Sequence, residues 1–395
     1  MSKKSQQPLL SFLKKEDAMK KIIVFTSDGA GGHTATTNAL KASMGDTYNI
    51  QAVNIFKDVI GEVDIIYTLS GHRMNGEQFY EHCMVRKYNT FLSALHGVGK
   101  WYFRRVQKKL GKMVERFLVK HQPDLVISVI PLVDGAIVQA TQKLGIPFLL
   151  LPTDLDSTNY IHDIYKPKHE LLRVTLPFED TDLRKKLIPA HIPTSQISVT
   201  GFPIRQDFFE HKDIKSIKQS FNVPENKPVI LVLMGSVGSD ALYSFTKELS
   251  KLPNEAHLII CTGRYEAIKQ KINTISFPTH ISTTMVGFTQ RISDLMAIAD
   301  LFITKAGPVS MSEAIYMNLP MLVDTTSSVL KWEKMNYQFI QKHEFGDVIK
   351  KAEDLPNMVS SILKDGKLQR MKDNLTAYDK KHGSNEVKSL IATMI

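Results

Sequence analysis

The chain has 395 residues, of which 43% are apolar and 23% are charged, and its formal net charge at pH 7 is +10. This length predicts two or three domains with an ample core. Only Cys83 and Cys261 are present, far apart and in no CxxC spacing, which excludes a disulfide framework and a cysteine zinc site and fits a reducing compartment.

Residues 1–20 are expected to form a flexible tail. Their basic start is followed only by short apolar stretches, with no small-residue cleavage pattern of a secretory signal. The longest apolar runs elsewhere, PVILVLMG and IPFLLLP, fall far short of a membrane span. The sequence therefore predicts a soluble or peripheral protein.

Apolar, β-branched runs alternate with helical patterns along the chain, which predicts an α/β protein with parallel sheets. In the first half, the expected strands are 21–27, 48–56, 124–130, 147–152 and 171–177. In the second half, they are 228–235, 256–263, 281–287, 300–305 and 320–324.

The stretch TGFPIRQDFFEHKD separates these two halves, and its turn residues and charges suit a linker. We expect an amino-terminal domain at 21–200, a linker at 201–212 and a carboxyl-terminal domain at 213–395. Both are expected to be doubly wound Rossmann-like domains that face a cleft. The last helix is a candidate to pack back on the first domain.

One glycine-rich loop follows the first strand of each half. In open α/β sheets, ligands bind at this position. In SDGAGGHT, Gly29, Gly31 and Gly32 precede a helix, so backbone N–H groups and the helix dipole can face an anion or a sugar. MGSVGSD, with Gly235 and Ser236, repeats this plan. Tight turns also use glycine for steric reasons alone. Neither loop matches GxGxxG or GxxxxGK[ST], which disfavours nicotinamide cofactors and ATP.

The excess positive charge is concentrated between Arg86 and His121, where ten Lys or Arg face one acid, Glu115. Apolar residues at helical spacing predict one helix with a buried stripe. The stripe consists of Phe103, Val106, Leu110, Met113 and Phe117. The basic faces fit either a solvated helix or a surface for lipid headgroups or nucleic acid. Nucleic acid is disfavoured because the chain lacks zinc-finger spacing, an RNP-like motif and basic heptads.

Residues 285–324, MVGFTQRISDLMAIADLFITKAGPVSMSEAIYMNLPMLVD, resemble the donor-binding region of family 28 glycosyltransferases, and among them the diacylglycerol glycosyltransferases. SDGAGGH is similar to the family's SDTGGGH loop, and TGFPIRQDF to its interdomain stretch. LMGSVG and CTGRYE agree in order. The matching residues in 285–324 are Gly287, Phe288, Thr289, Asp300, Lys305, Ala306, Gly307, Pro308, Ser312, Glu313, Leu319 and Pro320.

The resemblance implies a GT-B fold and an inverting hexosyltransferase that uses a UDP-sugar. The implied acceptor is diacylglycerol or another lipid at an anionic membrane surface, with no nucleic acid partner, no cofactor and no metal. It also implies a cytoplasmic enzyme, bound peripherally to the inner face of a membrane.

Gly307, Pro308, Val309 and Ser310 open a helix directly after a strand, where free N–H groups and the helix dipole suit a diphosphate. One turn later, Glu313 can accept hydrogen bonds from both ribose hydroxyls. The family uses its glutamate in this way, although an acid in a first turn also stabilises a helix dipole.

Phe288 is expected to hold the uracil or, alternatively, to be a core aromatic. Arg264 follows a strand and can reach a phosphate or lie at the surface. The family often has GQE where this chain has Lys331, Trp332 and Glu333.

Glu333 is retained as a reader of sugar hydroxyls, and Asn336 fits the pattern that follows it. Val309 and Ser310 also replace the family's usual Gly-Thr. The donor sugar therefore stays open between galactose, glucose and N-acetylglucosamine.

Glycosyl transfer needs a base for the acceptor hydroxyl and stabilisation of the departing UDP. His33 ends the first glycine loop, where the family carries a histidine, and it is the predicted base, with a capping role as the other interpretation. Asp28 is expected to orient or assist it, and Asp134 is the alternative base.

Asp154 and His162 are expected to border the acceptor, together with Gly31 and Gly32. The triplet DLD at 154–156 also matches the metal-binding DxD of a different transferase fold. Transferases of the two-domain type generally work without metal, so no metal site is expected.

At the membrane, Trp101 is expected to enter the interface with Phe91, Leu92 and Tyr102. The residues expected to meet anionic headgroups are Arg104, Arg105, Lys108, Lys109 and Lys112.

Two other functions stay open. One is transfer of N-acetylglucosamine to a polyprenyl-linked acceptor, and the other is a non-catalytic lipid- or nucleotide-binding relative. An epimerase is disfavoured because a GTRPE-like opening is missing.

Overall fold

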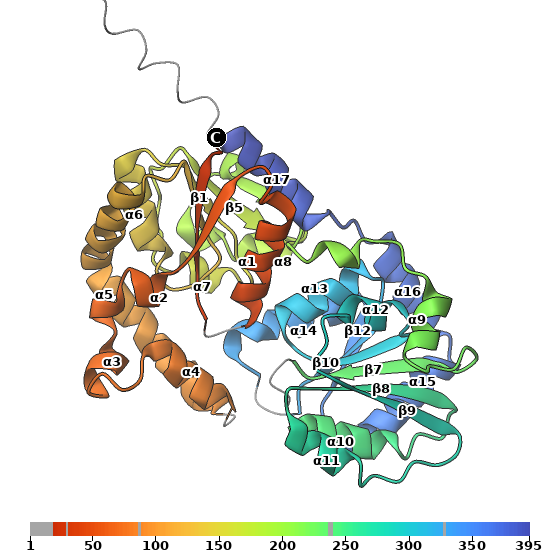
Figure 1. Ribbon diagram of the computed structural model, residues 1–395. Coiled ribbons are helices and arrows are strands. Elements are labelled where there is room, and N and C mark those ends of the chain that lie inside the picture. Colours follow the sequence, from red (N-terminus) through yellow and green to blue (C-terminus); the bar gives the residue numbers. More distant parts are fainter. Residues whose placement is uncertain (1–18, 29–30, 86–87, 236–239, 327–328) are drawn as a thin grey trace, which may run out of the picture.

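The computed structural model describes residues 19–28, 31–85, 88–235, 240–326 and 329–395, which form two sheet-centred units (Figure 1). The strands of the first sheet are β1 (Lys21–Thr26), β2 (Asn49–Asn54), β3 (Leu125–Ser128), β4 (Phe148–Leu150), β5 (Leu172–Leu176) and β6 (Ile197–Val199). Those of the second are β7 (Val229–Leu233), β8 (Ala256–Gly263), β9 (Ile281–Gly287), β10 (Leu301–Lys305), β11 (Met321–Asp324) and β12 (Gly346–Ile349). The ten expected strands are confirmed; β6 and β12 were missed.

Helices connect the strands in both units. The α-helices are α1 (Gly31–Met44), α2 (Ile55–Asp58), α3 (Ile65–Leu69), α4 (Gly76–Val85), α5 (Asn89–His121), α6 (Asp134–Leu144), α7 (Thr158–Ile161), α8 (Thr181–Lys185), α9 (Ile214–Ser220), α10 (Asp240–Leu249), α11 (Glu266–Ile272), α12 (Ile292–Ala297), α13 (Pro308–Tyr316), α14 (Lys334–Lys342), α15 (Leu355–Lys364), α16 (Lys367–Ala377) and α17 (Gly383–Met394). The 3₁₀ helices are η1 (Gly61–Val63), η2 (Ile188–Ala190), η3 (Thr194–Gln196), η4 (Gln206–Phe208), η5 (Lys331–Glu333) and η6 (Ala352–Asp354).

Both sheets are parallel and doubly wound. The strand order is β2-β1-β3-β4-β5-β6 in the first sheet and β12-β11-β10-β7-β8-β9 in the second. Strands such as β7 are buried along their whole length, as expected when helices cover both faces of a parallel sheet. The strand order reverses between β1 and β3 and between β7 and β10. Ligands of such sheets bind at these two switch points, beyond the carboxyl ends of the strands.

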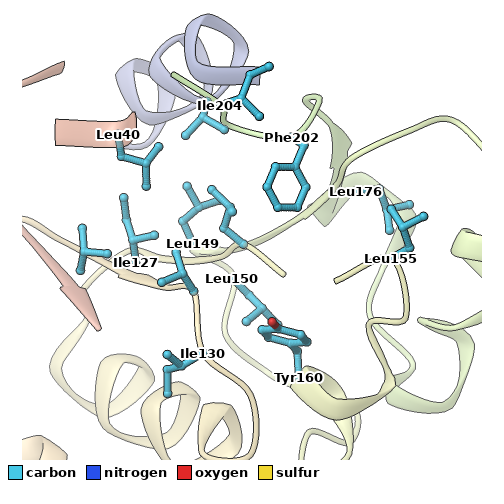
Figure 2. Close-up of a cluster of buried hydrophobic side chains, with 14 of the residues drawn as sticks. Leu40, Ile127, Ile130, Leu149, Leu150, Leu155, Tyr160, Leu176, Phe202 and Ile204 are labelled. Carbon is cyan, nitrogen blue, oxygen red and sulfur yellow. The ribbon is translucent and has the colours of Figure 1, made fainter. Parts of the chain in front are cut away.

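The linker and the last helix tie the two units together. Phe202 and Ile204 point into the core of the first unit, beside the strands that carry Ile127 and Leu149 (Figure 2). Figure 1 shows α17 lying against the first unit, next to α1, although it comes last in the chain. The Ser384 hydroxyl at its start donates to the Ile204 carbonyl over 3.1 Å.

Candidate active site

The glycine turn after β1 lies directly opposite the helix α13 of the other unit. A Cβ atom at Gly32 would lie 3.5 Å from Cγ2 of Val309, and one at Gly31 would meet nothing within 4 Å. Steric crowding within the protein therefore does not require glycine at either position. The free space beside exposed N–H groups is better suited to a ligand, and Gly29 lies outside the described residues.

His33 is the third residue of α1, so the helix begins earlier than the sequence predicted. Its Nδ1 atom lies 3.0 Å from the Thr153 hydroxyl in the loop after β4. Burial lowers the pKa of His33 to about 4, opposed by the Val129 backbone carbonyl, so the imidazole is neutral near pH 7. The ring thus has two hydrogen-bond partners, the Thr153 hydroxyl at Nδ1 and the Val129 carbonyl.

A tyrosine and a carboxylate lie behind this histidine. The Tyr160 hydroxyl lies 2.8 Å from the Thr153 hydroxyl and 3.4 Å from Oδ2 of Asp154. Burial, followed by the charge of Glu333, raises the pKa of Asp154 to about 8. Glu333 of the second unit therefore lies near Asp154, and a position of Asp154 beside the acceptor stays a prediction.

The two other acids predicted for catalysis have different surroundings: the prediction for Asp134 is corrected, and the one for Asp28 stays a prediction. Asp28 accepts a hydrogen bond from Asn54 over 2.9 Å, and its backbone N–H donates to Glu77; it makes no hydrogen bond to His33 within the described residues. Asp134 is 0% exposed, so an acceptor hydroxyl cannot reach it. Burial raises its pKa well above the ordinary range, which makes it a neutral core group.

His162 lies behind the acceptor side rather than on it. Its ring is almost buried, and Nδ1 lies 3.1 Å from the Asn159 carbonyl. Burial lowers its pKa to about 4. The prediction that His162 borders the acceptor is therefore corrected to a packing role beneath the loop after β4.

The second switch point brings a glycine and a lysine together. Gly235 adopts φ +87°, and a Cβ atom there would lie 3.1 Å from Cε of Lys305. Gly307 caps α13 in an extended conformation, with Pro308 at the first helical position. The exposed Lys305 ammonium and the free N–H groups of α13 thus converge after β7 and β10. Ser236 lies outside the described residues.

Two glutamates flank this point. Burial raises the pKa of Glu313 to about 8, with Arg205 of the linker opposing the shift. Burial also raises the pKa of Glu333, which Lys305 opposes. Carboxylates whose pKa is raised by burial are typical of functional sites.

Asn336 is corrected from a donor ligand to a supporting residue. It is 0% exposed, and its Nδ2 donates to the Ala306 carbonyl over 2.8 Å. It therefore fixes the turn that leads into α13 and is not available to a sugar.

Arg264 and Phe288 directly follow β8 and β9, whose last residues pair side by side. The Arg264 guanidinium lies 4.1 Å from the centre of the Phe288 ring. Phe288 is 53% exposed, which excludes the core-aromatic interpretation. The pair forms an accessible aromatic platform at the carboxyl edge of the second sheet.

In the basic helix α5, the stripe of apolar side chains faces the core, as predicted, and the basic side chains face solvent. Trp101 is 67% exposed, and the exposed basic residues next to it are Arg104, Arg105, Lys108 and Lys109. Phe91 is also exposed. Leu92 is 3% exposed and packs with Leu330 of the other unit, which corrects its predicted membrane role. The Tyr102 hydroxyl is held by the Val63 carbonyl.

Within the described residues, no group of three His, Cys, Asp or Glu side chains could hold a metal ion. None of the described helices is long and apolar enough to cross a membrane. Two residues of the site, Thr153 and Tyr160, were missed from sequence, and Lys305 was named only as a motif match without a role. Their signal was position, because Lys305 ends a strand and Thr153 closely follows one.

Comparison with known proteins agrees with this geometry. Residues 229–394 match the glycosyltransferase family 28 C-terminal domain. The chain is 25% identical over 369 residues to the processive diacylglycerol beta-glucosyltransferase of Bacillus subtilis (strain 168), covering 90% of each chain. It is 25% identical over 366 residues to monogalactosyldiacylglycerol synthase 1, chloroplastic, of Arabidopsis thaliana, covering 87% of this chain and 65% of the relative.

Among solved structures, MurG of Acinetobacter baumannii superimposes with a TM-score of 0.63 at 14% identity, covering 95% of this chain and 99% of MurG. This likeness concerns the fold alone. The GT-B fold and the resemblance to diacylglycerol glycosyltransferases are confirmed.

Proposed function

Because residues 229–394 match the glycosyltransferase family 28 C-terminal domain, we propose a specific reaction for this sugar-transferring enzyme. It moves a hexose from a UDP-sugar to diacylglycerol, with inversion at the anomeric carbon, at a membrane surface. The observation that carries the proposal is the approach of Gly32 to Val309. With the first residues of α1, which include His33, against the amino terminus of α13, a base and an anion site share one cleft.

On the donor side, the diphosphate binds at the amino terminus of α13, where Val309 and Ser310 carry the free N–H groups. The nearby Lys305 ammonium and the helix dipole stabilise the charge that develops on departing UDP, without a metal ion. Glu313 accepts hydrogen bonds from the ribose hydroxyls, and the exposed Phe288 supports the uracil.

On the acceptor side, His33 Nε2 removes the hydroxyl proton of diacylglycerol. The acceptor oxygen bonds to the anomeric carbon while the bond from that carbon to UDP breaks, and the electron pair leaves with UDP. A single displacement of this kind inverts the anomeric configuration. Glu333, which interacts electrostatically with both Lys305 and Asp154, reads hydroxyls of the hexose.

The membrane contact is assigned to one face of α5. Phe91, Val98 and Trp101 are exposed apolar side chains on the amino-terminal half of this helix. Arg104, and the basic residues after it, continue the same helix and suit anionic headgroups. An acceptor that stays in the bilayer can then reach the cleft.

The test is incubation of the purified protein with UDP-glucose, UDP-galactose and UDP-N-acetylglucosamine, each with vesicles containing diacylglycerol or a polyprenyl-linked acceptor. Lipid products are resolved by mass spectrometry. The proposal predicts a hexosyl-diacylglycerol from one of the two hexose donors. A product formed only from the polyprenyl-linked acceptor, or no product from any pair, would contradict it.

A further inference from the structure

We propose that Thr153 and Tyr160 are positioning residues that connect His33 to Asp154, and that the charge of Asp154 determines which ring nitrogen of His33 carries the proton. The inference rests on the proposed function and deepens it. Thr153, Tyr160 and Asp154 set the protonation state that the base His33 requires, although none of them accepts the substrate proton.

The connection is a continuous chain of side-chain contacts. His33 Nδ1 lies 3.0 Å from the Thr153 hydroxyl, which lies 2.8 Å from the Tyr160 hydroxyl, and this lies 3.4 Å from Asp154 Oδ2. The Thr153 backbone N–H also donates to the Tyr160 oxygen over 3.1 Å. A backbone N–H can only donate. The Tyr160 hydroxyl can therefore donate one hydrogen bond and accept one more.

Burial removes the competing partners that would break this chain. Thr153 is 2% exposed and Tyr160 is fully buried. The other acceptor near the Thr153 hydroxyl is the Val129 carbonyl at 3.4 Å, which is the longer contact and which also hydrogen-bonds the His33 ring. Because water has little access, the two hydroxyls donate in the same direction along the chain.

With Asp154 ionised, every hydrogen bond in this series is donated in the direction of the carboxylate, because a carboxylate can only accept. Tyr160 then donates to Asp154, Thr153 donates to Tyr160, and His33 Nδ1–H donates to Thr153. This order leaves Nε2 unprotonated, as removal of the acceptor proton requires. The carboxylate charge also stabilises the imidazolium that forms.

With Asp154 protonated, the direction of hydrogen-bond donation reverses. Asp154 donates to Tyr160, Tyr160 to Thr153, and Thr153 to His33 Nδ1. The ring proton then sits on Nε2, and the imidazole cannot act as a base there. The two directions differ by the position of hydrogens alone, with no movement of heavy atoms.

The groups that face Asp154 come from four places. Tyr160 of α7 contacts it directly, Asp156 lies on the same loop, Glu333 approaches from η5 of the second unit, and Tyr80 of α4 lies nearby. Asp134 of α6 faces Tyr160 from below. Two of these neighbours are acids that oppose ionisation of Asp154, and burial acts in the same direction. The ionisation of Asp154 therefore falls within reach of an ordinary pH titration.

Four variants test the chain. Tyr160→Phe removes the middle hydroxyl, and Thr153→Val removes the one next to His33. Thr153→Ser keeps a hydroxyl and serves as the conservative rescue. Tyr48→Phe is the matched control, because Tyr48 is buried in the core of the same unit and lies outside the chain.

The measured quantities are kcat, the KM for the UDP-sugar and the pH profile of kcat/KM between pH 6 and 9.5. For the unaltered protein, kcat/KM should rise with pH as Asp154 ionises. In Tyr160→Phe and Thr153→Val, kcat should fall about 10-fold or more at pH 9, up to the roughly 10²- to 10⁴-fold that a general base supplies, with little change in KM. Their profiles should lose the rise with pH, whereas Thr153→Ser and Tyr48→Phe should keep it. A rise retained in both chain-breaking variants would overturn the inference.

A second measurement is made on the unaltered protein and does not depend on the chain-breaking variants. In ¹⁵N-histidine-labelled protein, the two ring nitrogens of His33 report the tautomer directly, with its signals assigned by their loss in His33→Ala. The inference predicts Nε2–H at pH 6 and Nδ1–H at pH 9.5, and one tautomer at both pH values would refute it. Absence of transfer by the unaltered protein would refute the proposed function instead, whatever the tautomer.

Discussion

Replacing Glu313 by Gln is expected to stabilise the ligand-free protein while it weakens UDP binding. Glu313 lies on α13, and burial raises its pKa from the ordinary 4.5 to about 8. Between these pH values, the unfolded chain releases a proton that the folded protein keeps. The stability contributed by this group is therefore complete below pH 4.5 and is lost as the pH rises to about 8.

The size of the effect follows from the change in pKa. Each pKa unit is worth about 1.4 kcal/mol, so a pKa of about 8 instead of 4.5 corresponds to about 5 kcal/mol at most above pH 8. At pH 7, the corresponding figure is about 3 kcal/mol. Glutamine has a similar shape and no charge to bury, so Glu313→Gln should recover part of this energy.

For UDP, the same substitution replaces a carboxylate acceptor by an amide. Loss of hydrogen bonds to a charged group costs about 1.5–3 kcal/mol, which is roughly a 12- to 150-fold rise in Kd. Stability and ligand affinity should therefore change in opposite directions, as expected for a side chain retained for function.

Scanning calorimetry at pH 5, 7 and 8.5 measures the first effect, and titration calorimetry with UDP measures the second. The increase in Tm of Glu313→Gln should grow with pH, whereas the exposed Glu353→Gln should give no such trend. A Tm difference that is constant with pH would contradict the buried-carboxylate account. Unchanged UDP affinity in the folded variant would remove Glu313 from the ribose site.

Three further variants, the last with four substitutions, test other parts of the cleft and the surface. His33→Ala should lose most turnover, by about 10²- to 10⁴-fold in kcat, with UDP affinity nearly intact by calorimetry; near-normal kcat would place the base elsewhere. Arg264→Ala should weaken UDP binding more than uridine binding if its guanidinium reaches a phosphate, and equal losses would leave it only the stacking role on Phe288. Reversal of Arg104, Arg105, Lys108 and Lys109 to Glu should abolish sedimentation with anionic vesicles, at about 1 kcal/mol per residue, and binding that persists at normal salt sensitivity would assign the membrane contact to another surface.

The strands could be predicted because parallel sheets require continuous apolar runs, and ten such runs stand out in the sequence. β6 and β12 were missed because ISV and GDVI are short and contain residues with low strand propensity. The glycine loops and α13 were also predicted, since the carboxyl ends of strands converge by topology alone.

The errors concern burial and pairing between distant segments. Asp134 follows a strand just as Asp154 does, but α6 begins at Asp134 and buries it. Leu92 fits an exposed apolar helix face until Leu330 of the other unit packs against it. The contact from His33 to Thr153 spans 120 residues, and no local pattern encodes it.

We propose that the residues at the two switch points transfer a hexose from a UDP-sugar to diacylglycerol in one displacement. The most direct measurement is the anomeric configuration of the purified lipid product, determined by proton NMR after reaction with the preferred α-linked UDP-hexose, together with the amount of UDP released. The account predicts a β-linked hexosyl-diacylglycerol formed with one UDP per sugar. An α-linked product, or release of UDP and free hexose without any glycolipid, would contradict it.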